Sequence, residues 1–166
     1  MLQTTYLTVD ELKDFTPISA NVDVTLLENW IPVAESMHIV PILGTALDTA
    51  LKAELEATGT LTGDNYTLLT HIQNASAWYT FLESVTFIRT KAVNKGVTQG
   101  YSDNSNTTPL DDFKDFKQSI LDKAIFFRNY LIDFLTLNAS TYPLWRSDDD
   151  ECGESYNKDF SGGIWV

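Results

Sequence analysis

The sequence predicts an all-α protein: a small bundle of about four to five helices, a long polar inter-helix loop and an extended C-terminal arm. Two segments lead to this prediction. Residues 64–93 contain neither proline nor glycine, and their apolar residues recur at spacings of three and four, which is the period of an α-helix. Residues 113–135 show the same period along one apolar stripe, with acidic residues opposite. We expect residues 1–141 to form one helical domain and residues 142–166 to form the arm.

Length and hydropathy are those of a single soluble domain. The chain has 166 residues, 43% of them apolar, which suffices for one domain with a core. No apolar run approaches the roughly 20 residues needed to cross a bilayer. The N-terminus MLQTTYLTVDELKDF lacks the basic and apolar parts of a signal peptide. We therefore expect synthesis in a cytoplasm and no membrane partner.

The net charge of −12 limits the partners of this chain, because it repels phosphate backbones and anionic membranes. Independent nucleic-acid binding is disfavoured, although an acidic wall suits a channel through which DNA slides without sticking. Cys152 is the only cysteine, which excludes an internal disulfide and a multi-cysteine metal site. Its acidic neighbours disfavour the thiolate and argue against a nucleophilic role.

Two capping signals open the first helices. Thr8 and Glu11 have the spacing of a capping box, which predicts a helix from Val9 to Phe15. Asp23 caps a second helical segment, in which Pro32 and Pro41 are expected to kink or break the helix. Its apolar residues are expected to share one face: Leu26, Leu27, Trp30, Ile31, Ala34, Met37 and His38.

A third helix is predicted over residues 42–57, with Gly44 inside it as a point of close packing. Asp64 then caps the central helix, residues 64–93, which ends at Asn94-Lys95-Gly96. Trp78 and Phe81 lie off the main apolar line of this helix. Because a helix that is apolar on more than one side must be covered on more than one side, we expect the other segments to pack around it.

Residues 96–109 form a polar loop rich in Gly, Asn and Ser; loops of this length usually have a function or are disordered. Val97 and Tyr101 could form a short hairpin with the residues before Gly96. The last long helix is predicted to open at Thr108 or Pro109 and to end near Leu137. Its expected apolar stripe is Phe113, Phe116, Ile120, Leu121, Ala124, Phe127, Leu131, Phe134 and Leu135.

The arm has no helical period, yet it is rich in aromatic residues, in which disordered tails are poor. Its aromatic residues either fold back onto their own helices or dock on a neighbouring chain. Both alternatives stay open for Trp145, whereas docking on a partner is favoured for residues 160–166, which follow a charged spacer. The expected subunit, portal or tail contacts are Trp145, Tyr156, Phe160, Ile164, Trp165, Lys95, Gly96 and Tyr101.

No catalytic constellation is apparent. His38 and His71 have no carboxylate or cysteine at metal-ligand spacing on their own helices, and no phosphate loop, dinucleotide glycine pattern or nucleophile elbow is present. The acidic residues of 148–154 lack the spacing of a calcium loop and are interpreted as a solvated charge run. We predict no enzymatic activity, no cofactor and no metal site.

Three segments together resemble a known family: IVPILGTALDTALKAEL (39–55), LLTHIQNASAWYTFLESVTFI (68–88) and KAVNKGV (91–97). They are similar to small helical head-to-tail connector proteins of tailed bacteriophages, especially ring proteins of crAss-like and related Bacteroidetes phages. The resemblance covers about half of the chain. The family favours an aromatic residue where this chain has Asp48, and the loop after Gly100 and the arm have no counterpart in it.

The resemblance implies a structural virion protein, made in the host bacterial cytoplasm. It would form a homo-oligomeric neck ring, with the twelve-fold symmetry of the portal, around the DNA channel. Its partners would be the portal and neighbouring neck or tail proteins, and DNA would pass without sequence-specific binding. The alternative from another class is a non-enzymatic helical binding module or regulator that presents the arm or the acidic residues. A third hypothesis is an enzyme that uses acidic residues and His71.

Overall fold

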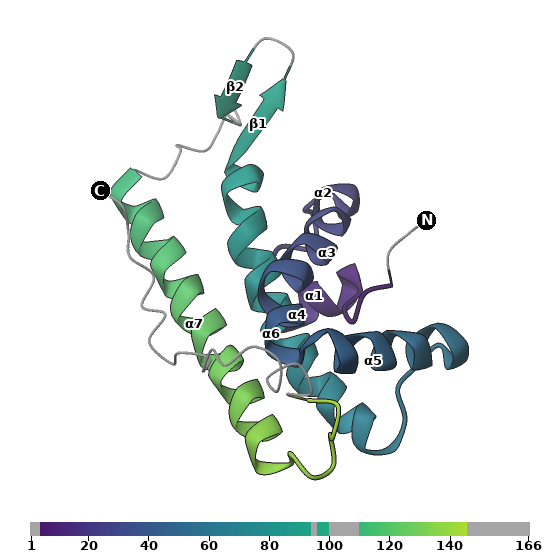
Figure 1. Cartoon of the computed structure of the whole chain (residues 1–166). Coiled ribbons are helices and arrows are strands. Elements are labelled where there is room, and N and C mark those ends of the chain that lie inside the picture. Colours follow the sequence, from purple (N-terminus) through teal and green to yellow (C-terminus); the bar gives the residue numbers. More distant parts are fainter. Residues whose placement is uncertain (1–3, 94–95, 100–109, 146–166) are drawn as a thin grey trace.

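The structure, a computed structural model, describes residues 4–93, 96–99 and 110–145 (Figure 1). It confirms the predicted all-α bundle, to which one two-stranded hairpin is added. In chain order the elements are α1 (Val9–Phe15), α2 (Val24–Glu28), α3 (Trp30–Ala34), the π-helix η1 (Glu35–Ile39), α4 (Val40–Leu43), α5 (Thr45–Thr58), α6 (Gly63–Arg89), β1 (Thr90–Val93), β2 (Gly96–Gln99) and α7 (Leu110–Leu137).

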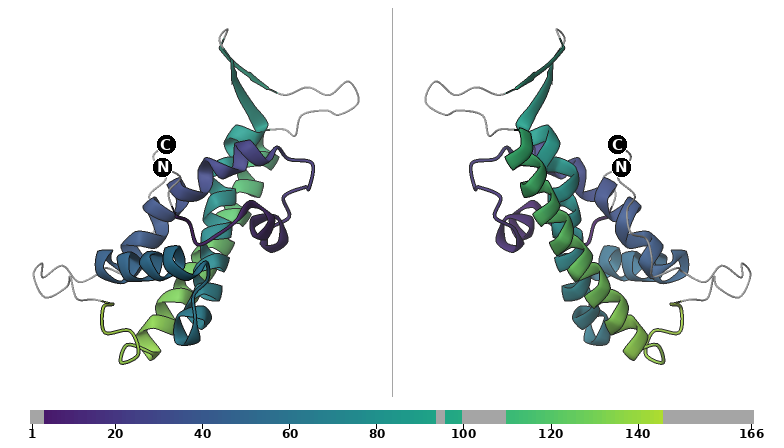
Figure 2. Two further views of the ribbon diagram at one scale, coloured as in Figure 1. Left: turned by 90° about the vertical axis from the view of Figure 1, so that its right-hand side faces the viewer. Right: turned by 90° about the vertical axis from the view of Figure 1, so that its left-hand side faces the viewer.

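Helix α6 is the central element, as the sequence predicts. It contacts α1, α2, α3 and η1 on one side and α7 on the other, an arrangement visible in Figures 1 and 2. Ala75 and Ala77, which point to opposite sides of the helix because they are two residues apart, are both fully buried. The wide apolar surface of α6 is therefore covered within the chain along this part of its length.

The two predicted helix caps are confirmed. The Thr8 hydroxyl accepts a hydrogen bond from the Glu11 backbone N–H at 3.3 Å, and the Glu11 carboxylate accepts one from the Thr8 backbone N–H at 2.8 Å. Asp23 Oδ1 accepts from the Thr25 backbone N–H at 2.9 Å. These local bonds satisfy amides that the first helical turn leaves without partners.

The segment from α2 to α4 is broken at different places from those predicted. The first break falls at Asn29, between α2 and α3, and not at Pro32. Pro32 lies in the first turn of α3, where its missing N–H costs no helical hydrogen bond. The expectation of one shared apolar face is also wrong: Ile31 is buried on one side of the segment, whereas Met37 is 56% exposed on the other.

Gly44 separates two helices, which corrects the prediction of a single helix over residues 42–57. Its backbone has φ 75° and ψ 153°, a region that only glycine occupies readily. The axes of residues Val24–Leu43 and Thr45–Thr58 bend there by 120°. Within the described part of the chain, no single helix has the length and apolar character of a membrane span; only this bent pair meets both criteria together.

The central helix ends at Arg89, four residues before the predicted end, because the chain changes to a strand at Thr90. Strand β1 pairs antiparallel with β2, with Thr90 opposite Gln99 and Val93 opposite Gly96. Threonine and valine favour extended backbone, which accounts for the change. A hairpin is thus present, and the predicted loop 96–109 begins with strand β2. The hairpin extends beyond the helical body in all views (Figures 1 and 2).

Helix α7 matches its predicted bounds to within two residues and lies beside α6 (Figure 1). The buried members of its predicted stripe are Ile120, Ala124, Leu131 and Leu135. Phe116, near the start of α7, is 46% exposed although its ring packs edge-on against Phe81 of α6 at 6.0 Å. The C-terminal part of α7 therefore supplies most of its contribution to the core.

Candidate functional site

Trp145, one of the predicted contact residues, packs inside its own chain. Its indole Nε1–H donates to the Ile42 carbonyl oxygen at 2.9 Å, and the side chain is buried. The Tyr142 hydroxyl similarly donates to the Asp64 carbonyl oxygen at 2.7 Å. Of the two alternatives for Trp145, the structure shows the intramolecular one. Residues 142–145 therefore pack against the helical body.

Gly96 is the first residue of β2 and pairs with Val93 at the far end of the hairpin. It is the only other predicted contact residue within the described ranges. Six predicted contact residues lie outside the described residues: Tyr156, Phe160, Ile164, Trp165, Lys95 and Tyr101. The arm as an interaction segment consequently remains a prediction.

Both histidines have aromatic neighbours, and His38 also has a carboxylate partner. His38 Nε2 lies 2.9 Å from Glu83 Oε1, and its ring stacks on Tyr79 with 4.0 Å between centroids. The hydrogen bond from His38 holds the pKa of Glu83 below its ordinary value. This pair joins η1 to α6, and the sequence spacing on one helix could not reveal it because the partner is 45 residues away.

His71 packs against α7, with its ring stacked on Phe134 at 4.2 Å and tilted against Tyr130 at 5.0 Å. Burial among these rings lowers the pKa of His71, because desolvation disfavours the charged imidazolium. The His71 ring therefore acts as a packing element between α6 and α7.

A buried polar cluster fastens the N-terminal segment to the body. Glu35 Oε1 accepts from the Tyr6 backbone N–H at 2.9 Å and from the Ser76 hydroxyl at 3.3 Å. The Tyr6 carbonyl oxygen accepts from Gln73 Nε2 at 3.0 Å. Burial raises the pKa of Glu35 from 4.5 to about 7. Because Tyr6 precedes α1 and belongs to no helix, side chains from η1 and α6 supply its backbone partners.

The Tyr6 side chain is held by α5. Its hydroxyl donates to Asp48 Oδ1 at 2.8 Å, and Lys52 Nζ lies 3.1 Å from the same oxygen and 5.3 Å from the Tyr6 ring centroid. Burial and the Asp48 carboxylate raise the pKa of Tyr6, so its hydroxyl stays protonated and remains a donor. The arrangement explains why Asp48 is buried: it is both paired and hydrogen-bonded.

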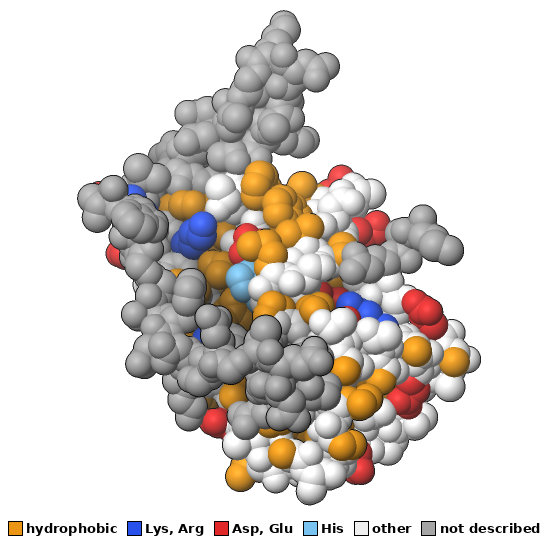
Figure 3. Space-filling model, viewed as in Figure 1, with side chains coloured by type: hydrophobic (Ala, Val, Ile, Leu, Met, Phe, Trp, Pro, Cys, Tyr) orange, Lys and Arg blue, Asp and Glu red, His pale blue; other side chains and the backbone are white. Residues whose placement is uncertain are grey.

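An exposed apolar surface lies on the solvent-facing side of α3 and η1. We call it the α3 face and define it by Trp30, Val33, Met37 and Phe87. The Trp30 and Phe87 rings stack with 4.3 Å between centroids, which joins α3 to the end of α6. Val33, Met37 and Phe87 are exposed, and Figure 3 shows hydrophobic atoms gathered between α3 and the upper part of α6. An apolar grouping of this kind is typical of an interaction surface.

A second exposed apolar surface follows one edge of α7. We call it the α7 flank and define it by Phe126, Tyr130 and Leu137, which recur at helical spacing and are all exposed. The Phe126 and Tyr130 rings stack with 6.3 Å between centroids. Leu137 is 84% exposed at the end of the helix. The solvent-facing surface of α7 therefore contains these apolar side chains in addition to the polar ones predicted from the sequence.

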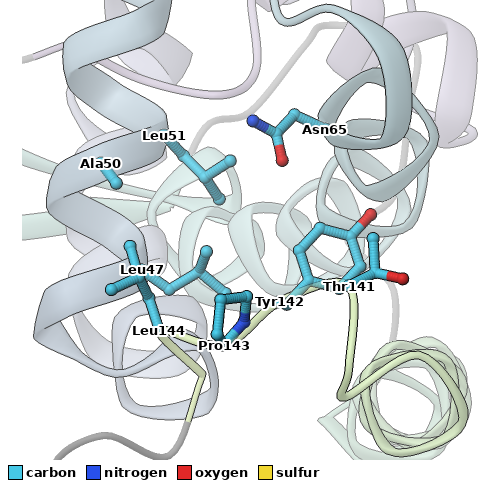
Figure 4. A pocket seen from close by; sticks show the side chains of 8 residues that line it. All are labelled: Leu47, Ala50, Leu51, Asn65, Thr141, Tyr142, Pro143 and Leu144. Carbon is cyan, nitrogen blue, oxygen red and sulfur yellow. The ribbon is translucent and has the colours of Figure 1, made fainter.

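A small open cavity of about 140 Å³ lies between α5, the start of α6 and the residues after α7 (Figure 4). Leu47, Leu51 and Tyr142 give it a largely apolar lining. This volume accommodates a benzene-sized group, such as one side chain of a partner. In residues 4–93, 96–99 and 110–145, no three His, Cys, Asp or Glu side chains are grouped so that they could hold a metal ion.

Residues 39–154 match the family described as a family of unknown function, DUF6712. The chain belongs to the DUF6712 family. The family region starts at the end of η1, so it includes the α6–α7 pair and the hairpin but excludes α1, α2, α3 and Glu35. No curated protein and no solved structure matches the chain. The description of the DUF6712 family assigns it no activity.

Proposed function

We propose that this DUF6712 protein is a structural virion protein that forms a head-to-tail connector ring between the portal and the tail of a tailed bacteriophage. The ring would surround the DNA channel with the twelve-fold symmetry of the portal. The observation that carries the proposal is the presence of two separate exposed apolar surfaces, the α3 face and the α7 flank, on one small helical domain. Two different surfaces are what a head-to-tail contact between identical subunits requires.

Two further features support a ring subunit. The hairpin formed by β1 and β2 extends beyond the helical body (Figure 2), so it can reach a neighbouring chain or a portal subunit. The net charge of −12 would let DNA pass through the channel without adhering to it, since like charges repel. Residues 146–166 would add contacts to neighbouring subunits, to the portal or to other neck and tail proteins in the assembled virion.

The test is electron microscopy of the purified protein, alone and mixed with its candidate portal. Closed rings with a central hole, alone or on the portal, are expected. A Phe126→Glu/Leu137→Glu variant, which places charge on the α7 flank, should lose the rings but keep its helical circular dichroism. The matched control is Asp122→Asn/Asn129→Asp, which changes exposed polar residues on α7 and should assemble normally.

Monomers under both conditions would refute the ring and favour the alternative of a helical binding module or regulator. In that case the α3 face and the α7 flank would be contact surfaces for a different protein.

A further inference from the structure

We infer that, in the unassembled subunit, the α3 face is covered by the C-terminal segment of the same chain, residues 146–166. The starting observation is the exposure of Val33, Met37 and Phe87, apolar side chains that a free subunit would otherwise present to water. Exposed apolar patches promote non-specific association. The chain itself provides a segment suited to cover one, because residues 146–166 carry Tyr156, Phe160, Ile164 and Trp165.

The position of Trp145 places the start of this segment beside the face. Trp145 donates its indole N–H to Ile42 at the end of α4. The α3 face lies on the same helical segment, starting five residues earlier at Met37, and the exposed Pro41 stands between them. The last described residue is therefore anchored where the apolar stripe ends, and the chain that follows starts at the edge of the surface it has to cover.

The segment is long enough to span the face. From Ile42 back to Trp30 is twelve residues, or roughly 18 Å along a helix axis at 1.5 Å per residue. Tyr156 lies eleven residues after Trp145, and a chain of eleven residues spans at most about 36–40 Å. The aromatic residues of the segment therefore lie within reach of the whole face.

Tethering favours the same chain over a second copy in dilute solution. A short tether between two segments gives an effective local concentration in the millimolar range, well above the micromolar concentration of a typical purified sample. In an assembly, the segment of a neighbouring subunit could make the same contact. This would be domain swapping, the exchange of an identical segment between subunits, and it costs little free energy once the chains are held together. The inference concerns the free subunit and stands whether or not the protein forms a ring.

Methionine oxidation offers a direct readout. The chain has two methionines, Met1 and Met37, and oxidation by hydrogen peroxide depends on exposure of the thioether. In the full-length free subunit, Met37 should oxidise more slowly than in a full-length Phe160→Ser/Trp165→Ser variant, by about threefold or more. Met1 provides the internal control and should react equally in both. Equal rates for Met37 in the two proteins would overturn the inference.

Photo-crosslinking identifies the occupant. Benzoylphenylalanine replaces Met37 in the full chain, and equal amounts of ¹⁴N-labelled and ¹⁵N-labelled subunits are mixed before irradiation. The expected products join position 37 to residues 146–166 with both peptides carrying the same isotope. The same probe in place of Asn129, an exposed polar residue of α7, should give no such product. Mixed-isotope pairs would instead identify the segment of a second copy, and crosslinks to any other segment would also refute the inference.

Discussion

The Tyr6 backbone N–H donates to Glu35 Oε1 at 2.9 Å, so a residue outside all helices is bound by a carboxyl group of the π-helix η1. Glu35 is 1% exposed, and burial raises its pKa from 4.5 to about 7. The native state therefore binds a proton at this carboxyl group that the unfolded chain releases near pH 4.5. Burial of this carboxyl group makes the stability of the folded chain depend on pH, although the hydrogen bond from Tyr6 by itself favours the carboxylate.

The contribution of Glu35 to stability should fall as the pH rises from about 4.5 to about 7. The unfolded chain binds fewer protons than the native state in this window, so the free energy of unfolding decreases with pH. The full effect is on the order of 3 kcal/mol. Urea unfolding between pH 5 and pH 8 should show this decrease, and it should be much smaller in Glu35→Gln. Glu28→Gln, which changes an exposed carboxyl group of α2, should retain the wild-type slope.

Gly44→Ala should destabilise the protein by roughly 1–3 kcal/mol, because a side chain is strained at φ 75° and ψ 153°. Gly59 is the control, since it has a left-handed φ of 76° with nothing within 4 Å of an added Cβ. Gly59→Ala should cost about 1 kcal/mol, because a residue with a Cβ is disfavoured in the left-handed region. Chemical denaturation of both variants measures the difference, and an equal loss at the two positions would contradict the assigned conformation of Gly44.

Trp145→Phe should lower the free energy of unfolding by about 1–2 kcal/mol, because it removes the donor to the buried Ile42 carbonyl group. Both partners belong to one chain, so the loss should not change with protein concentration. Hydrogen exchange should accelerate in residues 138–145. An effect that appears only at concentrations where the protein associates would indicate that Trp145 acts between chains instead.

Leu131→Ala and Leu137→Ala form a matched pair on α7. Leu131 is fully buried against the core, whereas Leu137 is 84% exposed. Truncation of the buried leucine should cost about 2–5 kcal/mol, and truncation of the exposed one less than about 0.5 kcal/mol. Thermal unfolding of the monomeric protein is the appropriate measurement. In an assembled sample, a larger effect of Leu137→Ala would indicate that the α7 flank is covered by a neighbour.

Features that depend on local sequence were predictable. The Thr8–Glu11 capping box and the Asp23 cap are made between residues two or three positions apart, so their chemistry is visible in the sequence. The packing of other segments around α6 was predictable, because this helix carries apolar residues on more than one side. Its early end at Arg89 was missed because residues 90–93 contain no proline or glycine, although Thr90 and Val93 favour a strand.

Features that depend on distant residues were not predictable from spacing. The Glu83 partner of His38 lies 45 residues away, and Glu35 and Gln73 meet Tyr6 from two different elements. The α3 face was also missed. The segment of α3 and η1 is apolar on both sides, so the period alone could not decide whether Ile31 or Met37 faces the core. Ile31 faces the core because α6 packs against only its side of the segment, which leaves Met37 exposed.

The central position of α6 also determines the order in which the protein can fold during synthesis. Leu12, Leu27 and Ile31 are buried in the core that α6 completes, but all residues before Gly63 leave the ribosome before that helix exists. Gln73 and Ser76, which complete the hydrogen bonds around Tyr6 and Glu35, are made later still. Because chains emerge N-terminus first, α1 to α5 cannot reach their final packing alone. The first half of the chain must stay unaggregated until α6 has been translated.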